Sequence, residues 1–278
     1  MSIASMLVPV SLSARDEKVL RYVSGLREQS VRRVIVATAV DTSGMEAPVA
    51  AVEVDRCRAR LAEMAHVLDG SGMEVETRVM TGPPADAIQG LAREAGVDVI
   101  CLGSEGKSAV DFLFSGSVSE SVFTSGRART MVVRYGLLES VEDPSEVGRD
   151  FAKRLVVPTD FSESAERAWL SAFDRPAEAI GEVHAIVAMA PEASPPERER
   201  ALAELARLKG VAAEHGVQAT TSLRHGSPLQ VILGYLSEVK ATGVITGQRG
   251  RGTLRRMVLG STSLSLLREA QCPVVVQP

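Results

Sequence analysis

The chain carries the stretch Gly243-Val-Ile-Thr-Gly-Gln-Arg-Gly250, which is separated by nine residues from Gly260-Ser261. A β-branched run that ends in glycine predicts a buried strand and a tight turn, and the following Gly-Ser pair predicts a helix start. Glycine at a strand exit lets backbone N–H groups approach a ligand without a Cβ in the way. The N-terminus of a helix attracts anions. The stretch therefore predicts a strand, a glycine-rich arm and a helix that can hold a phosphate.

The same pattern occurs a second time, 144 residues earlier. The repeated members are Gly103, Gly106, Gly116 and Ser117. Short apolar runs that contain proline, residues 6–11 and 155–160, open the two halves at an offset of 149 residues. Repetition over this distance indicates a tandem duplication. The change of offset places a connection shorter by five residues in the second half.

Each half alternates β-branched runs with helical patterns. The predicted strands of the first half are residues 6–10, 34–40, 75–80, 97–102 and 131–134, and its predicted helices are 16–29, 50–68, 85–95 and 117–124. In the second half the predicted strands are 155–159, 183–189, 219–223, 243–246 and 274–277, and the predicted helices are 164–173, 196–215, 228–239 and 261–270. Alternating elements with nearly continuous apolar strands predict a parallel sheet covered by helices on both faces. We expect two tandem doubly wound, Rossmann-like α/β domains.

We place the domains at residues 1–137 and 151–278. The segment between them carries acidic residues with Pro144 and Gly148, which predicts an exposed linker. The net charge of −4 and the 4% aromatic content argue against nucleic-acid binding. No apolar run of membrane-spanning length and no signal peptide is visible, so we expect a cytoplasmic protein that does not bind membranes. Three cysteines at long spacings predict neither a disulfide framework nor a metal site.

The strand ends are the places where ligands bind in such sheets. Asp160 follows the first strand of the second half, and Arg249 lies in the glycine-rich arm. The basic run from Arg249 to Arg256 suits phosphate contact, although nucleic-acid binding and a solvated face are alternatives. The glycines could also serve only to tighten strand–helix turns. Gly106-Lys107-Ser108 is not a P-loop, because the first glycine of that motif would stand at Cys101.

These motifs resemble the universal stress protein family, and the resemblance covers nearly all of both halves. The residues that carry it are Pro158-Thr159-Asp160, the stretch from Gly247 to Gly252 with Gly260-Ser261, and the closing Cys272-Pro-Val-Val-Val276. The second half looks like the ATP-binding subgroup of that family. The resemblance implies a five-stranded parallel sheet of order 3-2-1-4-5, ATP or AMP as the ligand, and pairing of two domains through their fifth strands.

The resemblance also implies roles for individual residues. Asp160 would hold ribose or adenine, and Ala188-Met189 would offer backbone contacts to adenine. The expected ligand-binding residues of the second half are Pro158, Thr159, Asp160, Met189, Gly247, Arg249, Gly250, Gly260, Ser261 and Thr262. Those of the first half are Gly103, Gly106, Gly116 and Ser117. Magnesium would accompany ATP, and no protein-held metal is expected.

The first half departs from the pattern. Ser11 stands where the second half has Asp160, and Glu105 and Asp111 stand where it has Arg249 and Arg255. An acid near a phosphate is unfavourable, so we expect the first domain to bind nucleotide more weakly, or not at all.

Three functional hypotheses follow. The favoured one is a stress-response regulatory protein that binds an adenine nucleotide. The second is an enzyme that slowly hydrolyses ATP or transfers a phosphoryl group, but no general base or magnesium-binding carboxylate pair is evident beyond Asp160. The third is an interaction module with relic sites. The sequence leaves homodimer formation open.

Overall fold

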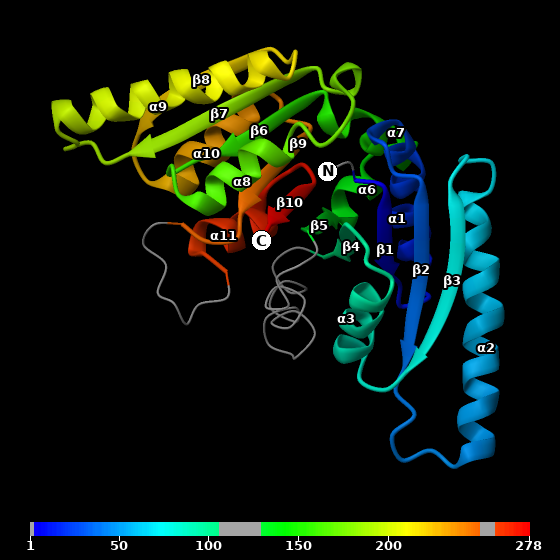
Figure 1. The fold of residues 1–278 in the computed structure, drawn as a ribbon. Helices are drawn as coiled ribbons and strands as arrows, with labels where there is room; N and C mark the ends of the chain where they lie inside the picture. The colour runs from blue at the N-terminus through cyan, green and yellow to red at the C-terminus, as the bar shows by residue number, and fades with distance from the viewer. Residues whose placement is uncertain (1–2, 106–128, 251–258) are drawn as a thin grey trace. The chain divides into compact units, whose positions relative to one another are not determined.

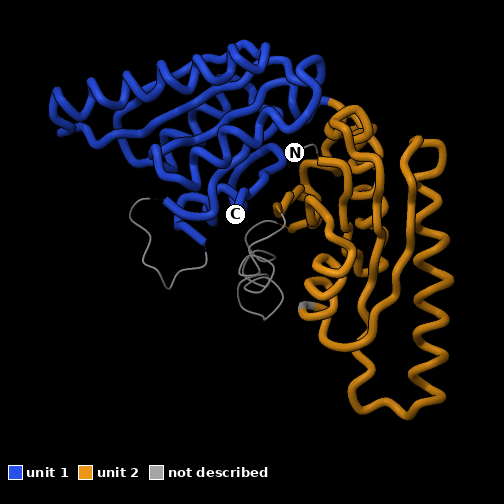
Figure 2. The backbone as a smooth tube through the Cα atoms, viewed as in Figure 1, with its two compact units in different colours: residues 1–2, 150–278 blue, residues 3–149 orange. Residues whose placement is uncertain are grey.

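The computed structural model describes residues 3–105, 129–250 and 259–278. It divides into two compact units, residues 3–149 and residues 150–278 (Figure 2). Each unit is a parallel sheet with helices packed against it, as the alternation of elements in the sequence predicts (Figure 1).

In the first unit the strands lie in the order β3-β2-β1-β4-β5, and all their pairings are parallel. The strands are β1 (Ser5–Pro9), β2 (Arg33–Val40), β3 (Glu74–Thr81), β4 (Val99–Ser104) and β5 (Arg129–Arg134). The helices between them are α1 (Ala14–Gly25), α2 (Ala47–Ala65) and α3 (Pro84–Glu94). Ser13 and Asp16 form the capping box that their spacing predicts at the start of α1.

The second unit repeats this arrangement, with the order β10-β9-β6-β7-β8. The strands are β6 (Arg154–Pro158), β7 (Glu182–Met189), β8 (Ala219–His225), β9 (Gly243–Gly247) and β10 (Val274–Gln277). The helices are α8 (Glu163–Ser171), α9 (Pro195–Glu214), α10 (Pro228–Glu238) and α11 (Ser261–Glu269). Read from its third strand, each sheet has the order 3-2-1-4-5. The predicted fold class is confirmed.

The cores are aliphatic, and the central strands are buried on both faces. Leu7, Val36 and Val156 are among the strand residues that are fully enclosed. Trp169 of α8 and Cys101 of β4 are also buried, as expected of core residues. None of the described helices is long and apolar enough to cross a lipid bilayer.

The segment after β5 is not the exposed linker that its composition predicts. It forms two short helices, α6 (Tyr135–Glu139) and α7 (Pro144–Arg149), which pack against α1. The physical reason is that Leu138 and Pro144 are buried, and that Gly148 allows its backbone to lie directly against that of Tyr22. The predicted helix 117–124 lies outside the described residues.

Candidate functional site

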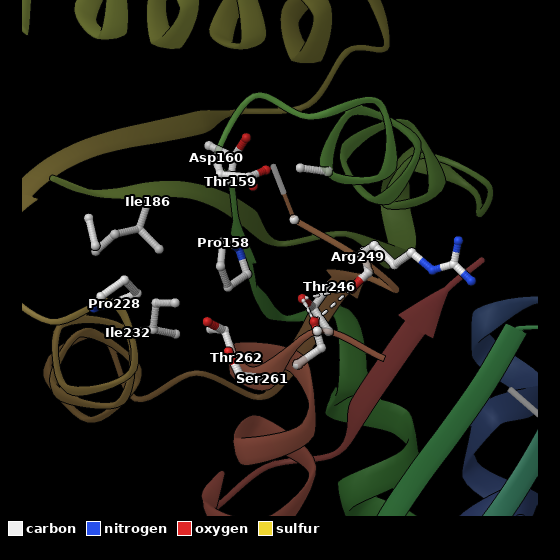
Figure 3. Close-up of a pocket in the computed structure, with 16 residues that line it drawn as sticks. Pro158, Thr159, Asp160, Ile186, Pro228, Ile232, Thr246, Arg249, Ser261 and Thr262 are labelled. Atoms are coloured by element: carbon white, nitrogen blue, oxygen red, sulfur yellow. Dashed lines mark hydrogen bonds between the residues drawn. The ribbon is translucent and has the colours of Figure 1, made fainter. Parts of the chain in front are cut away.

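A cavity of about 330 Å³ opens at the carboxyl ends of β6, β7 and β9, where parallel sheets bind ligands (Figure 3). Six elements, with the loops beside them, supply its walls: β6, α8, β7, α10, β9 and α11. The lining residues are Pro158, Thr159, Asp160, Ala165, Ile186, Ala188, Pro228, Ile232, Thr246, Gly247, Arg249, Gly250, Gly260, Ser261, Thr262 and Ser263. Every expected ligand-binding residue of the second half except Met189 is among them.

The turn after β6 fixes the backbone around Asp160. The Asp160 carboxylate accepts a hydrogen bond from the backbone N–H of Ser162 at 3.0 Å, and the Thr159 hydroxyl accepts one from the backbone N–H of Phe161 at 3.0 Å. Phe161 adopts the left-handed conformation with φ of 59°. These bonds hold Asp160 at the exit of β6 and lead the chain into α8, which Ser162 caps.

Gly250 comes close to Asp160 across the cavity. A Cβ placed on Gly250 would lie 2.7 Å from Asp160 Oδ2. A side chain at this position would therefore displace the Asp160 carboxylate or shift the backbone of Gly250.

Gly247 has a different reason to be glycine. A Cβ at this position would collide with Ser164 of α8, so its absence allows β9 and α8 to pack together. The hydroxyl of Ser164 also accepts a hydrogen bond from the backbone N–H of Arg249 at 3.3 Å. Gly247 thus serves the packing of a strand against a helix, which is the alternative role that the sequence leaves open for these glycines.

The N-terminus of α11 is attached to the exit of β9. The Ser263 hydroxyl donates to the carbonyl of Gly247 at 2.7 Å and lies 3.2 Å from the hydroxyl of Thr246. The Gly260 N–H donates to the carbonyl of Gln248 at 2.9 Å. The first-turn N–H groups of α11, which have no partner within the helix, therefore start at a defined place beside Gly260 and Ser261.

The wall formed by β7 and α10 is apolar, and sequence reasoning missed it except for Ala188. Ile186 comes from β7, and Pro228 and Ile232 come from α10 (Figure 3). Ala188 of β7 also lines this wall. Strand periodicity could have identified Ile186 and Ala188 once the partner helix was known, since strand residues two positions apart share a face of the sheet. Met189, from which we expect a backbone contact, is not among the lining residues, and its carbonyl accepts a hydrogen bond from the N–H of Gly226 at 2.9 Å. Its role in binding stays a prediction.

The corresponding place in the first unit is built differently. Asp16 is only 3% exposed and stands where the second unit has Ala165. Its carboxylate accepts hydrogen bonds from the backbone N–H and the hydroxyl of Ser11, at 3.0 and 2.9 Å, and from Ser13. The Tyr135 hydroxyl donates to the other carboxylate oxygen at 3.1 Å. Burial, and then the negative charge of Asp16, raise the pKa of Tyr135.

Side chains also cover the exit of β4. A Cβ on Gly103 would lie 2.6 Å from the Tyr135 hydroxyl oxygen, so the tyrosine packs directly on this glycine. Arg15 pairs with Glu105 and, at 3.4 Å, with Glu139 of α6. Gly106, Gly116 and Ser117, the remaining expected residues of the first half, lie outside the described residues.

In the described part of the chain, no group of three or more His, Cys, Asp or Glu side chains is arranged to hold a metal ion.

The model of the universal stress protein family matches residues 3–134 and again residues 152–278. The chain belongs to the universal stress protein family. It contains two domains of this family in tandem, which explains the repeated glycine pattern and the two similar sheets.

One solved structure resembles this chain over both halves, and shorter relatives match about half of it. A solved universal stress protein from Archaeoglobus fulgidus is 25% identical, with a TM-score of 0.78, and the match covers 99% of this chain and 96% of that one. A universal stress protein of Methanocaldococcus jannaschii is 28% identical over 159 residues, covering 52% of this chain and 92% of that protein. A family protein from Arabidopsis thaliana was solved with AMP bound; it is 19% identical over 45% of this chain and 90% of its own, with a TM-score of 0.33.

Proposed function

We propose that the second domain binds an adenine nucleotide, ATP or AMP, and that occupancy of this site regulates the protein in a stress response. The observation that carries the proposal is the composition of one cavity, which combines an anion-binding end, a carboxylate and an apolar wall. A nucleotide has the matching three parts: phosphate, ribose and base. The cavity also falls within the range of typical small-molecule sites, roughly 300–1,000 Å³.

Each part of the ligand has a natural partner. The N–H groups at the start of α11, the Ser261 hydroxyl and Arg249 suit the phosphates, because they offer donors and positive charge. The Asp160 carboxylate suits the ribose hydroxyls, since it accepts hydrogen bonds only. Ile186, Ala188 and Ile232 suit the flat apolar faces of adenine. Magnesium would enter with the phosphates of ATP.

The test is mass spectrometry of small molecules released from heat-denatured protein, followed by calorimetric titration with ATP, AMP and GTP. We expect adenine nucleotides to bind and Asp160→Ala to weaken them by about tenfold or more, which corresponds to about 1.4 kcal/mol. Asp174→Ala, in the same domain but not among the cavity-lining residues, is the matched control. Failure of all adenine nucleotides to bind at millimolar concentration would contradict the proposal.

The same preparation separates regulation from catalysis. A regulatory role predicts ATP turnover far below the roughly 1–100 s⁻¹ that is typical of kinases. Turnover in that range, abolished by Asp160→Ala, would favour the enzyme instead.

A further inference from the structure

A buried histidine lies behind the apolar wall of the cavity. His184 of β7 is 5% exposed. Its Nδ1 lies 3.0 Å from the Tyr235 hydroxyl of α10, its Nε2 lies 3.3 Å from the Glu182 carboxylate, and its ring meets the Tyr235 ring edge-on at 5.8 Å. This is a polar pair inside an otherwise aliphatic interface.

The pair belongs to the same interface as the cavity wall. His184, Ile186 and Ala188 alternate along β7 and therefore share the face that packs on α10. Pro228, Ile232 and Tyr235 are spaced by four and three residues, so they share one face of α10. The His184–Tyr235 pair forms the end of this interface, and the residues beyond it line the cavity.

The first domain shows that packing alone does not need a polar pair. Ile35 stands at the position of His184, because Leu7 pairs with Ile35 in the same register in which Val156 pairs with His184. Leu91 stands at the position of Tyr235, seven residues after the proline that opens each helix. In that domain β2 and α3 pack together with two aliphatic residues. A buried hydrogen-bonded pair instead fixes one geometry between its two elements.

Charged groups surround the pair on several elements. Glu182 lies on the same strand, and Arg154 of β6 lies 4.0 Å from it. Arg224 of β8 lies over the Tyr235 ring at 5.7 Å and pairs with Glu238 of α10 at 2.8 Å. Burial lowers the pKa of His184 below its ordinary value, although the negative charge of Glu182 acts in the opposite direction.

We propose that His184 and Tyr235 are positioning residues that set the spacing of β7 and α10 and so make adenine binding sensitive to acid. The proposal rests on the proposed function of the cavity. In the neutral His184 tautomer whose Nδ1 accepts the Tyr235 hydroxyl proton, Nε2 carries the ring hydrogen and lies 3.3 Å from the Glu182 carboxylate. A second proton on His184 turns Nδ1 into a donor. The Tyr235 proton must then find another acceptor in a buried interface, which costs free energy.

The sign of the effect follows from this change. Adenine binds between β7 and α10 at the spacing that the neutral, hydrogen-bonded His184–Tyr235 pair sets. Binding therefore disfavours the second proton on His184, so the bound protein has the lower His184 pKa. Affinity is therefore full above the His184 pKa of the free protein and falls as the pH drops through it. The loss is about tenfold for each unit by which the pKa differs between the free and bound protein.

Titrations with ATP between about pH 8 and pH 5.5 test this proposal on the intact chain. The variant His184→Ile/Tyr235→Leu installs the aliphatic pair that the first domain has at these positions. Its affinity for ATP should no longer show the decrease at low pH that protonation of His184 causes. Titration of the phosphates of ATP is common to all variants and cancels in the comparison. His225→Gln, which removes an exposed histidine near α10, should keep the wild-type profile. Parallel profiles for the wild type and the double variant would overturn the proposal.

A ligand-free measurement separates this proposal from the proposed function. Methyl NMR of Ile186 and Ile232 should show both resonances shifting with the titration of His184 in the wild type and not in Tyr235→Phe. Methyl resonances that do not shift with the titration of His184 would overturn the proposal even if ATP binds. Methyls that follow it, in a protein that binds no nucleotide, would support the positioning role and contradict only the assigned ligand.

Discussion

Individual residues of the cavity are constrained more by their protein neighbours than their motif suggests. Gly247 makes room for α8, and Gly250 makes room for the Asp160 carboxylate. Both glycines appear in the sequence as parts of one phosphate-binding pattern. The motif therefore depends on packing between elements as well as on any ligand.

Gly250→Val should weaken adenine-nucleotide binding by about tenfold or more while the domain still folds, since the conformation of Gly250 is not left-handed and the nearest obstacle is a side chain. The new Cβ displaces the Asp160 carboxylate or lifts the arm. Calorimetry with ATP measures the change. Gly234→Ala, at a glycine with open space around it, is the control and should bind normally. Unchanged affinity in Gly250→Val would mean that neither Asp160 nor the arm contacts the ligand.

Among the elements, the helices α6 and α7 differ most from expectation. Acidic residues, proline and glycine usually mark an exposed linker, yet here they fold back on α1. Close approach of two backbones makes this possible: Gly25 of α1 lies against Ser145, and Gly148 of α7 lies against Tyr22. Tyr135 adds a hydrogen bond to the buried Asp16. We therefore assign α6 and α7 to the first domain.

Two glycine substitutions should have opposite effects on the stability of the first domain. Gly148→Ala should destabilise it by about 1–3 kcal/mol, because the Cβ collides with the Tyr22 carbonyl. Gly136→Ala, in α6 with open space around it, should be neutral or stabilising by up to about 1 kcal/mol, because alanine favours helix. Urea unfolding followed by circular dichroism measures both. The fluorescence of the single tryptophan, Trp169, reports on the second domain. The urea midpoint of this fluorescence transition should be unchanged in both variants. Equal effects would show that α7 does not hold its place on α1.

For the whole molecule, the two domains share one fold but present different groups at the matching strand ends. The second has Ala165 and Arg249 where the first has Asp16 and Glu105. The buried carboxylate of Asp16 and the exposed carboxylate of Glu105 both repel a phosphate. In addition, Tyr135 packs directly on Gly103 at the end of β4.

We expect one tight adenine-nucleotide site per chain. Calorimetry on the intact protein should give a stoichiometry near one, and Asp160→Ala should remove most of the binding heat. Asp16→Asn, a change in the first domain, should leave the affinity of the tight site unchanged. Two sites of equal affinity, or a tight site that survives Asp160→Ala, would contradict this expectation.

The pairing of the domains through their fifth strands, which the family resemblance implies, stays a prediction. Exposed apolar edge strands invite aggregation, so pairing would protect them. Val276→Pro removes a backbone donor from the side of β10 that faces away from β9, and it should open such a pair. Small-angle scattering should show a compact particle for the wild type and a more extended one for the variant. Two separated lobes in the wild type would rule the pairing out.

The duplication, and the succession of strands and helices along the chain, can be derived from the residues alone. Asp160, Gly250 and Ser261, which line the cavity of the second domain, can be found in the same way, whereas Pro158 and Thr159 enter through the family resemblance. These features depend on local periodicity, glycine spacing and the rule that parallel strands bind ligands at their carboxyl ends. They are short-range or repeat within the chain, so local patterns reveal them.

Which side chains meet across long separations depends on the tertiary fold. The apolar wall of Ile186 and Ile232, the bond from Ser263 to Gly247, and the Asp16–Tyr135 contact are set by strand register and helix rotation. A rotation by one helical residue or a shift by one strand position would present different side chains, because faces repeat at 3.6 and at 2 residues. Packing of the whole core sets both, and no local pattern in the sequence records the result.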